Sequence, residues 1–166
     1  AALEGMWKAL PNLMEPNKSM LVVADGSGSM LSRCAGNISC LDVANSLAIY
    51  CADRAKGAFA NKYITFSMTP KFVEFGKDWT LQRKIKEAER HDECANTNLE
   101  AVFNLILKTA IDNHSPQSDL PENILILSDM AFDSMCTAYE SRDGYGWHRN
   151  VKVTKSFIDG IKSRFE

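Results

Sequence analysis

The sequence predicts an α/β domain with a Rossmann-like, mainly parallel sheet. Apolar runs that are short enough for buried strands occupy residues 19–24, 62–67 and 123–128. Between them, residues 38–54 and 99–111 carry apolar side chains at helical spacing. Strands that alternate with helices in this way are typical of a parallel α/β sheet. The run at 123–128 is apolar enough to predict a central strand.

The other segments complete this arrangement. Residues 71–75 follow Pro70 soon after the second strand, so they are expected to form an antiparallel edge strand. A charged helix is predicted over residues 80–90. Residues 1–17 are interrupted by prolines, and we expect a short helix and a lead-in that packs on the domain formed by residues 18–166.

The end of the sequence lacks an expected element. Residues 151–165 have the pattern of an amphipathic helix, and a crossover helix needs a strand to return to. No buried strand follows it in the sequence. We therefore expect either an unusually short sheet without its final strand or an excerpt of a longer polypeptide. An open sheet edge can pair with a second copy, so the sequence leaves the oligomeric state undecided.

Composition excludes several classes of protein. The 166 residues, 45% hydrophobic and 24% charged, suffice for one domain, which buries roughly 70% of the unfolded chain's surface. A net charge of -2 does not indicate the basic surface that binds nucleic acid, and the sequence has no polybasic segment of the kind that binds a membrane. No run approaches the roughly 20 apolar residues of a transmembrane helix, and no signal peptide is visible. These features predict a cytoplasmic protein.

The cysteines favour the same compartment. They are odd in number and scattered, which indicates reduced thiols rather than a disulfide framework. A bridge between Cys34 and Cys40 across a short loop is the alternative. The five cysteines are Cys34, Cys40, Cys51, Cys94 and Cys136.

A polar loop directly follows the first strand. In this loop Asp25, Ser27 and Ser29 alternate with Gly26 and Gly28. Open α/β sheets bind their ligands at the carboxyl ends of strands. One carboxylate with two hydroxyls is hard oxygen chemistry, which suits Mg²⁺ better than a soft metal. The loop therefore indicates a cation site, although by itself it is also an ordinary turn sequence.

Two later segments place polar side chains at corresponding positions. Thr97 precedes the helix at 99–111, and Asp129 ends the strand at 123–128. Together with the first loop they resemble the von Willebrand factor A (vWA) domain family. Its metal-ion-dependent adhesion site (MIDAS) uses an Asp-x-Ser-x-Ser loop, a Thr from a second loop and an Asp from a third. The resemblance covers nearly the whole chain and implies a vWA fold with helices on both faces of the sheet. The metal ligands that it implies are Asp25, Ser27, Ser29, Thr97 and Asp129.

A narrower resemblance comes from residues 128–133, Ser-Asp-Met-Ala-Phe-Asp. This segment is similar to the third metal loop of A-domains in Ro/TROVE-type RNA-binding proteins and in related uncharacterised viral, fungal and plant proteins. Two residues depart from the commoner vWA pattern. Met130 stands in place of a glycine, and Gly26 replaces an apolar residue. Neither departure removes one of the five implied ligands.

The vWA resemblance also implies a function. The expected activity is divalent-cation-dependent protein interaction, without catalysis, in which a Glu or Asp of a partner protein completes the metal shell. Mg²⁺ is the expected cation, with Mn²⁺ or Ca²⁺ as alternatives. Because Mg²⁺ prefers six oxygens and keeps several waters, Asp25 and Asp129 are expected to act partly through water. We expect the site to lie at the rim of the sheet. In a Ro-like RNA-binding protein, this domain would be the part that does not bind RNA.

Several alternatives stay open from the sequence. Thr97 can instead cap the helix that begins at Leu99, with Glu100 completing a capping box. An open Mg²⁺ site can also support a hydrolase that uses metal-bound water, although no lysine or histidine base is placed beside the acids. A zinc site at His91 and Cys94 lacks two further ligands at recognisable spacing.

Overall fold

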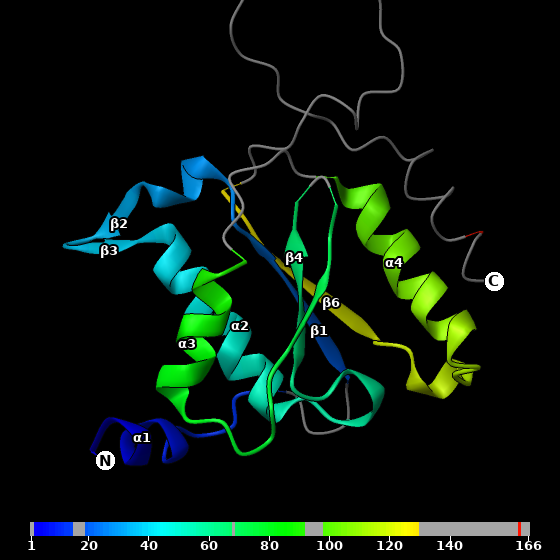
Figure 1. Cartoon of the computed structure of the whole chain (residues 1–166), viewed down its shortest axis with the longest axis horizontal. Helices are drawn as coiled ribbons and strands as arrows, with labels where there is room; N and C mark the ends of the chain where they lie inside the picture. The colour runs from blue at the N-terminus through cyan, green and yellow to red at the C-terminus, as the bar shows by residue number, and fades with distance from the viewer. Residues whose placement is uncertain (1, 15–18, 68, 92–97, 130–162, 164–166) are drawn as a thin grey trace, which may run out of the picture.

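The computed structural model shows an α/β domain around a mixed four-stranded sheet. The strands are β1 (Met20–Asp25), β4 (Lys62–Phe66), β5 (Phe72–Glu74) and β6 (Asn123–Leu127). Their order is β5-β4-β1-β6 (Figure 1). β1 is parallel to both neighbours and β5 is antiparallel to β4, so the predicted strand directions are confirmed. The structure describes residues 2–14, 19–67, 69–91, 98–129 and 163.

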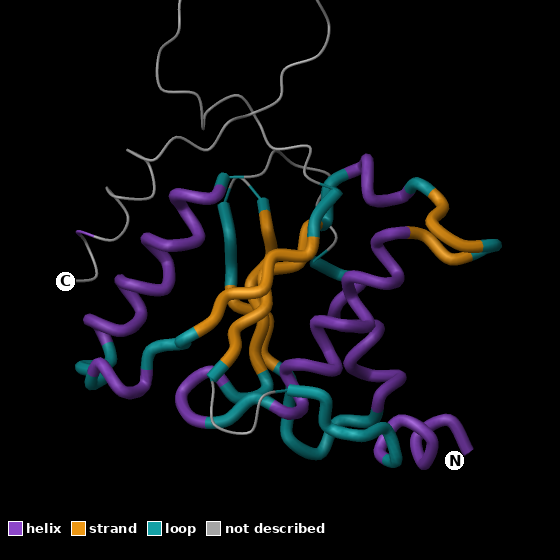
Figure 2. Tube along the Cα trace, turned by 180° about the vertical axis from the view of Figure 1, so that it is seen from behind, coloured by secondary structure: helices purple, strands orange, loops and turns teal. Residues whose placement is uncertain are grey.

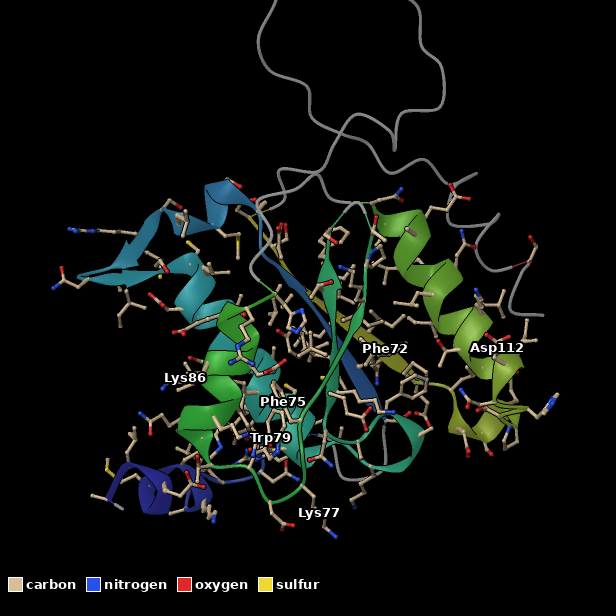
Figure 3. All side chains as sticks on the ribbon, in the orientation of Figure 1. Phe72, Phe75, Lys77, Trp79, Lys86 and Asp112 are labelled. Atoms are coloured by element: carbon tan, nitrogen blue, oxygen red, sulfur yellow. The ribbon has the colours of Figure 1, made fainter. Side chains whose placement is uncertain are left out.

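Helices cover both faces of this sheet. They are α2 (Cys40–Arg54), α3 (Leu81–Glu89) and α4 (Leu99–Asp112). α2 and α3 lie on one face and α4 on the other (Figures 1 and 2). Successive strand residues point to opposite faces, so Ala24 packs in the cluster with α2 and α3, whereas Val23 packs with α4. Phe75 and Phe72, at β5, likewise belong to these two clusters (Figure 3).

β6 was predicted to be a central strand. In the described part of the chain it pairs with β1 alone, and all five of its residues are half-buried. Its expected central position is therefore not found among those residues. Residues 130–162, which carry most of the helix predicted at 151–165, lie outside the described residues.

A small hairpin precedes α2 and is absent from the prediction. It joins β2 (Arg33–Ala35) to β3 (Ile38–Ser39), and the helix expected from residue 38 begins at Cys40 instead. The turn is Gly36-Asn37, with Gly36 at a positive φ of 55°. Such a two-residue turn favours glycine because other residues are strained there. The Gly-Asn pair is therefore the sequence signal that was missed.

α2 begins with a complete capping box. The Ser39 hydroxyl accepts a hydrogen bond from the Asp42 N–H at 3.1 Å, and the Asp42 carboxylate accepts from the Ser39 N–H at 2.8 Å. The Ser39 N–H and the Ser39 hydroxyl, which donates to the same carboxylate at 2.7 Å, lower the pKa of Asp42. Two backbone donors at the helix start are thus satisfied reciprocally.

Ser39→Ala should lower the free energy of unfolding by about 1 kcal/mol, because it removes the acceptor for one of these donors. Urea denaturation measures the change. Ser118→Ala, at an exposed serine, should leave the midpoint unchanged. Equal midpoints for the Ser39 variant and the wild-type chain would show that the box contributes nothing.

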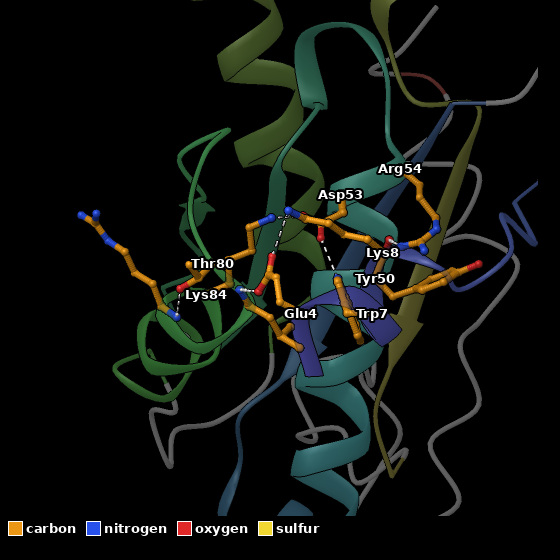
Figure 4. A network of polar contacts seen from close by, with 10 residues as sticks. Glu4, Trp7, Lys8, Tyr50, Asp53, Arg54, Thr80 and Lys84 are labelled. Atoms are coloured by element: carbon orange, nitrogen blue, oxygen red, sulfur yellow. Dashed lines mark hydrogen bonds and ion pairs between the residues drawn. The ribbon is translucent and has the colours of Figure 1, made fainter. Parts of the chain in front are cut away.

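The N-terminal helix α1 (Ala2–Lys8) contacts α2 and the start of α3 (Figure 4). Trp7 Nε1 donates to Asp53 Oδ2 at 3.0 Å, and the Glu4 carboxylate accepts from the Leu81 N–H at 2.8 Å. The second contact lowers the pKa of Glu4. It therefore contributes to stability above the pKa of an unfolded glutamate and is lost as the pH falls through the lowered folded pKa.

The lead-in after α1 is held by two side chains of α2. The Tyr50 hydroxyl donates to the Pro11 carbonyl at 2.6 Å and accepts from the Leu13 N–H at 2.8 Å. Arg54 lies over the Tyr50 ring and donates to the Leu10 carbonyl at 3.1 Å. The N-terminal segment is therefore attached to the helical layer by specific polar contacts.

The described cysteines are free thiols: Cys34, Cys40 and Cys51. The alternative of a Cys34–Cys40 bridge is therefore wrong. Burial raises the pKa of the Cys51 thiol, which keeps it protonated. Cys94 and Cys136 lie outside the described residues. No helix in the described ranges combines the length and the hydrophobicity that a bilayer crossing requires.

Candidate metal site at the carboxyl edge of the sheet

Three parallel strands end at one edge of the sheet, and each is followed or ended by a polar residue. Asp25 is the last residue of β1, Ser67 follows β4, and Ser128 follows β6. Asp25 is in register with Phe66, and Ala24 is in register with Leu127. The strand alignment therefore brings the polar ends of three separate segments to the same edge.

Asp25 is held from two directions. Its side chain is fully buried, with a relative exposure of 0%. Oδ1 accepts a hydrogen bond from the Ser27 N–H at 2.9 Å, which closes a turn within the loop. Oδ2 accepts from the Ser128 hydroxyl at 2.5 Å, across 103 residues of sequence. Asp25 thus ends β1 at the edge of the sheet, but its carboxylate is buried there rather than open to solvent.

The two loop serines lie together and closer to solvent. Ser27 is half-buried, Ser29 is exposed, and their hydroxyl oxygens are 3.0 Å apart. A short 3-10 helix, η1 (Gly28–Leu31), carries Ser29, and its buried residue Met30 donates its N–H to the Ser27 carbonyl at 3.0 Å. The buried methionine anchors the turn and leaves both hydroxyls at the surface.

The other two predicted ligands are placed only in part. Asp129 is exposed and directly follows Ser128, which contacts Asp25. Thr97 lies outside the described residues, but its neighbour Asn98 donates its N–H to the Ser67 carbonyl at 3.3 Å. Asn98, the first described residue after Thr97, is therefore bonded to the residue that follows β4 at this edge.

The alternative role of Thr97 as a helix cap is wrong. The cap of α4 is Asn98, whose side-chain oxygen accepts from the Ala101 N–H at 3.0 Å.

Two residues at this edge were missed in the sequence, Ser67 and Ser128. Each is a serine that directly follows an apolar strand, and that position was the only available signal. A serine there is equally well satisfied by water, so the pattern does not reveal a role.

The donors at this edge suit a hard cation. They are carboxylate and hydroxyl oxygens, which Mg²⁺ prefers, and several coordination positions would be left to water. No ion pair joins Asp25 to a basic residue within the described ranges. A buried carboxylate without an opposite charge is costly, and a bound cation would supply that charge.

Softer metal chemistry finds no support in the described residues. No group of three or more His, Cys, Asp or Glu side chains gathers there. A site with two acids and three hydroxyls is of a different kind, because serine and threonine supply most of its ligands. His91 Nε2 lies 3.3 Å from a Glu87 carboxylate oxygen, and its proposed zinc partner Cys94 is outside the described residues.

A pocket of about 270 Å³ adjoins the edge. Its apolar wall includes Met30, Val43 and Leu47, and its polar end is formed by Ser128 and Asp129.

Comparison with known proteins identifies the family. A profile for DUF7788, described as a domain of unknown function, matches residues 19–165. The chain belongs to the DUF7788 family. The matched region begins just before β1, so it contains the described strands β1, β4, β5 and β6 and the polar residues at their edge. Helix α1 precedes it.

This DUF7788 chain is also similar to the Uncharacterized protein L728 of Acanthamoeba polyphaga mimivirus. The two are 25% identical over 159 residues, which is 93% of this chain and 27% of the viral protein. The chain thus spans about a quarter of that relative's length. No solved structure matches it.

Proposed function

We propose that this DUF7788 domain is a vWA-like, divalent-cation-dependent protein-interaction module. Its metal residues would be Asp25, Ser27, Ser29, Thr97 and Asp129, with Mg²⁺ as the cation and Mn²⁺ or Ca²⁺ as alternatives. The observation that carries the proposal is the buried Asp25 carboxylate, which the Ser27 N–H and the Ser128 hydroxyl hold in place. A fixed acid next to a half-buried and an exposed hydroxyl, those of Ser27 and Ser29, is a suitable anchor for a hard cation.

The proposed coordination follows from what each side chain can reach. The hydroxyls of Ser27 and Ser29 are adjacent and accessible, so they would bind the cation directly. Asp25, already bonded through both oxygens, would act mainly through water and by fixing the loop. The remaining positions would be open to a Glu or Asp of a partner protein.

The order of the elements along the chain supports the assignment of a vWA-like fold. The predicted ligands lie at the end of β1 and just after it, before α4, and after β6, which is the order of the three metal loops in the vWA resemblance. The antiparallel edge strand β5 and helices on both faces of the sheet also agree with it. The apolar pocket next to Asp129 favours a partner segment in which the acid has an apolar neighbour.

A thermal melt tests the metal part of the proposal. The 166-residue chain, first treated with EDTA, should show a saturable rise in melting temperature with MgCl₂, because a ligand that binds only the folded state stabilises it. The stabilisation reaches about 2.7 kcal/mol at a cation concentration one hundred times the dissociation constant. KCl at matched ionic strength controls for screening. No shift at millimolar Mg²⁺ or Mn²⁺ would contradict the proposal.

A second experiment tests the partner chemistry. An immobilised peptide library that presents a single Glu or Asp among apolar residues should retain the chain with Mg²⁺ and release it with EDTA. The same peptides with Gln or Asn are the matched control, because they keep the shape and remove the charge. Equal retention on the acidic and amide peptides would contradict carboxylate recognition.

A further inference from the structure

Ser67 carries a buried hydroxyl without a partner in the described part of the chain. The residue is 3% exposed, and its Oγ has no hydrogen-bond partner there. Buried hydroxyls are nearly always hydrogen-bonded, because an unmade bond leaves the loss of hydration uncompensated. An exception of this kind calls for an explanation, and its position suggests one.

Ser67 lies between the segments that carry the predicted ligands. It directly follows β4, whose last residue is in register with Asp25. Its carbonyl accepts from the N–H of Asn98, the residue next to Thr97 in the chain. The unpartnered hydroxyl is therefore at the same sheet edge as the candidate cation site.

The rest of β4 shows that polar side chains on this strand normally find partners. Thr65, two residues earlier, is also buried, and its hydroxyl oxygen accepts from the Lys71 N–H at 3.0 Å. That bond closes the connection between β4 and β5, so it is structural. Ser67 has a similar burial without such a bond.

We propose that Ser67 is a positioning residue of the cation site, whose hydroxyl makes its hydrogen bond only when a hydrated divalent cation is bound at the carboxyl edge. The inference rests on the proposed function. It adds a residue that lies outside the Asp-x-Ser-x-Ser, Thr and Asp set. A hydroxyl that gains its partner on binding would favour the cation-bound state and contribute nothing to the cation-free state.

Ser67→Ala in the 166-residue chain tests this inference. The melting temperature in EDTA should stay equal or rise, because a buried hydroxyl without a partner is removed. Isothermal titration with MgCl₂ should give about tenfold weaker binding, which is the effect of losing one hydrogen bond to the hydrated cation. Ser67→Cys keeps a side chain of similar volume but replaces the hydroxyl with a weak donor. It should also bind Mg²⁺ weakly, which would show that the lost hydroxyl, rather than a cavity, causes the effect.

Thr65→Val is the matched control on the same strand. It should lower the melting temperature in EDTA and leave the Mg²⁺ affinity unchanged, because its hydrogen bond is made without the cation. Unchanged Mg²⁺ affinity in Ser67→Ala, whatever its melting temperature, would overturn the inference and leave the proposed function standing. Absence of Mg²⁺ binding by the wild-type chain would overturn both.

Discussion

Asp25→Asn is expected to weaken Mg²⁺ binding about 100-fold while the fold stays intact. Asn keeps the shape of the side chain. Its oxygen can still accept from the Ser27 N–H, and its amide can donate to the Ser128 hydroxyl, which then acts as the acceptor. The variant thus removes the charge and preserves both contacts. Calorimetric titration with MgCl₂ measures the loss, and a melt in EDTA checks the fold.

The structure makes Asn the better test than Ala at this position. Asp25→Ala would leave the Ser27 N–H and the Ser128 hydroxyl without their acceptor in a fully buried place, so a loss of binding could reflect unfolding. Asp112→Asn supplies the control, because it makes the same change at an exposed residue ending α4 (Figure 3). Wild-type affinity in Asp25→Asn would show that its charge plays no part in the site.

Lys84→Met should lower the free energy of unfolding by about 3 kcal/mol. Lys84 is 7% exposed, and its ammonium pairs with Asp53 Oδ1 at 2.5 Å (Figure 4). The same carboxylate accepts from Trp7 Nε1. Removal of the lysine charge would leave the largely buried Asp53 carboxylate with Trp7 Nε1 as a neutral donor. Removing one partner of a buried ion pair is costly because the other charge stays uncompensated. Urea denaturation measures the effect.

Two further variants give this prediction its controls. Lys86 lies on the exposed side of α3 (Figure 3). Lys86→Met should therefore change the free energy of unfolding by less than about 0.5 kcal/mol. The double variant Lys84→Met with Asp53→Asn should recover part of the loss, because no uncompensated charge remains. If Lys84→Met and Lys86→Met were equally stable, the buried pair would have no net effect on folding.

The sequence was informative wherever the signal was local. The apolar run that ends at Asp25 predicted a buried strand and a polar loop at its carboxyl end, and β1 and that loop are where they were expected. The helices at 80–90 and 99–111 were predicted to within about one residue, because the residue pattern that predicts them is local; Thr80 and Asn98 cap them in the structure. The resemblance then selected five candidate ligands, of which the structure describes four.

Other features depended on partners that are distant in the sequence. The contact of Ser128 with Asp25 spans 103 residues, and the pair of Lys84 with Asp53 spans 31. In the sequence, Lys84 belonged to a charged helix and Ser128 ended an apolar strand, so neither stood out. The hairpin at 33–39 was missed for a different reason: its strands are too short to show a periodicity.

The sequence by itself determined the α/β class, the strand directions and the polar loop after β1, because hydrophobic spacing, turn residues and caps act over a few neighbouring positions. Only the tertiary structure decided that Asp25 is buried and that Ser128 fixes its carboxylate. It also decided that the Ser67 hydroxyl, at the same edge, has no partner among the described residues. The partner of a buried polar group is set by strand register and layer packing, which join residues that no local pattern connects.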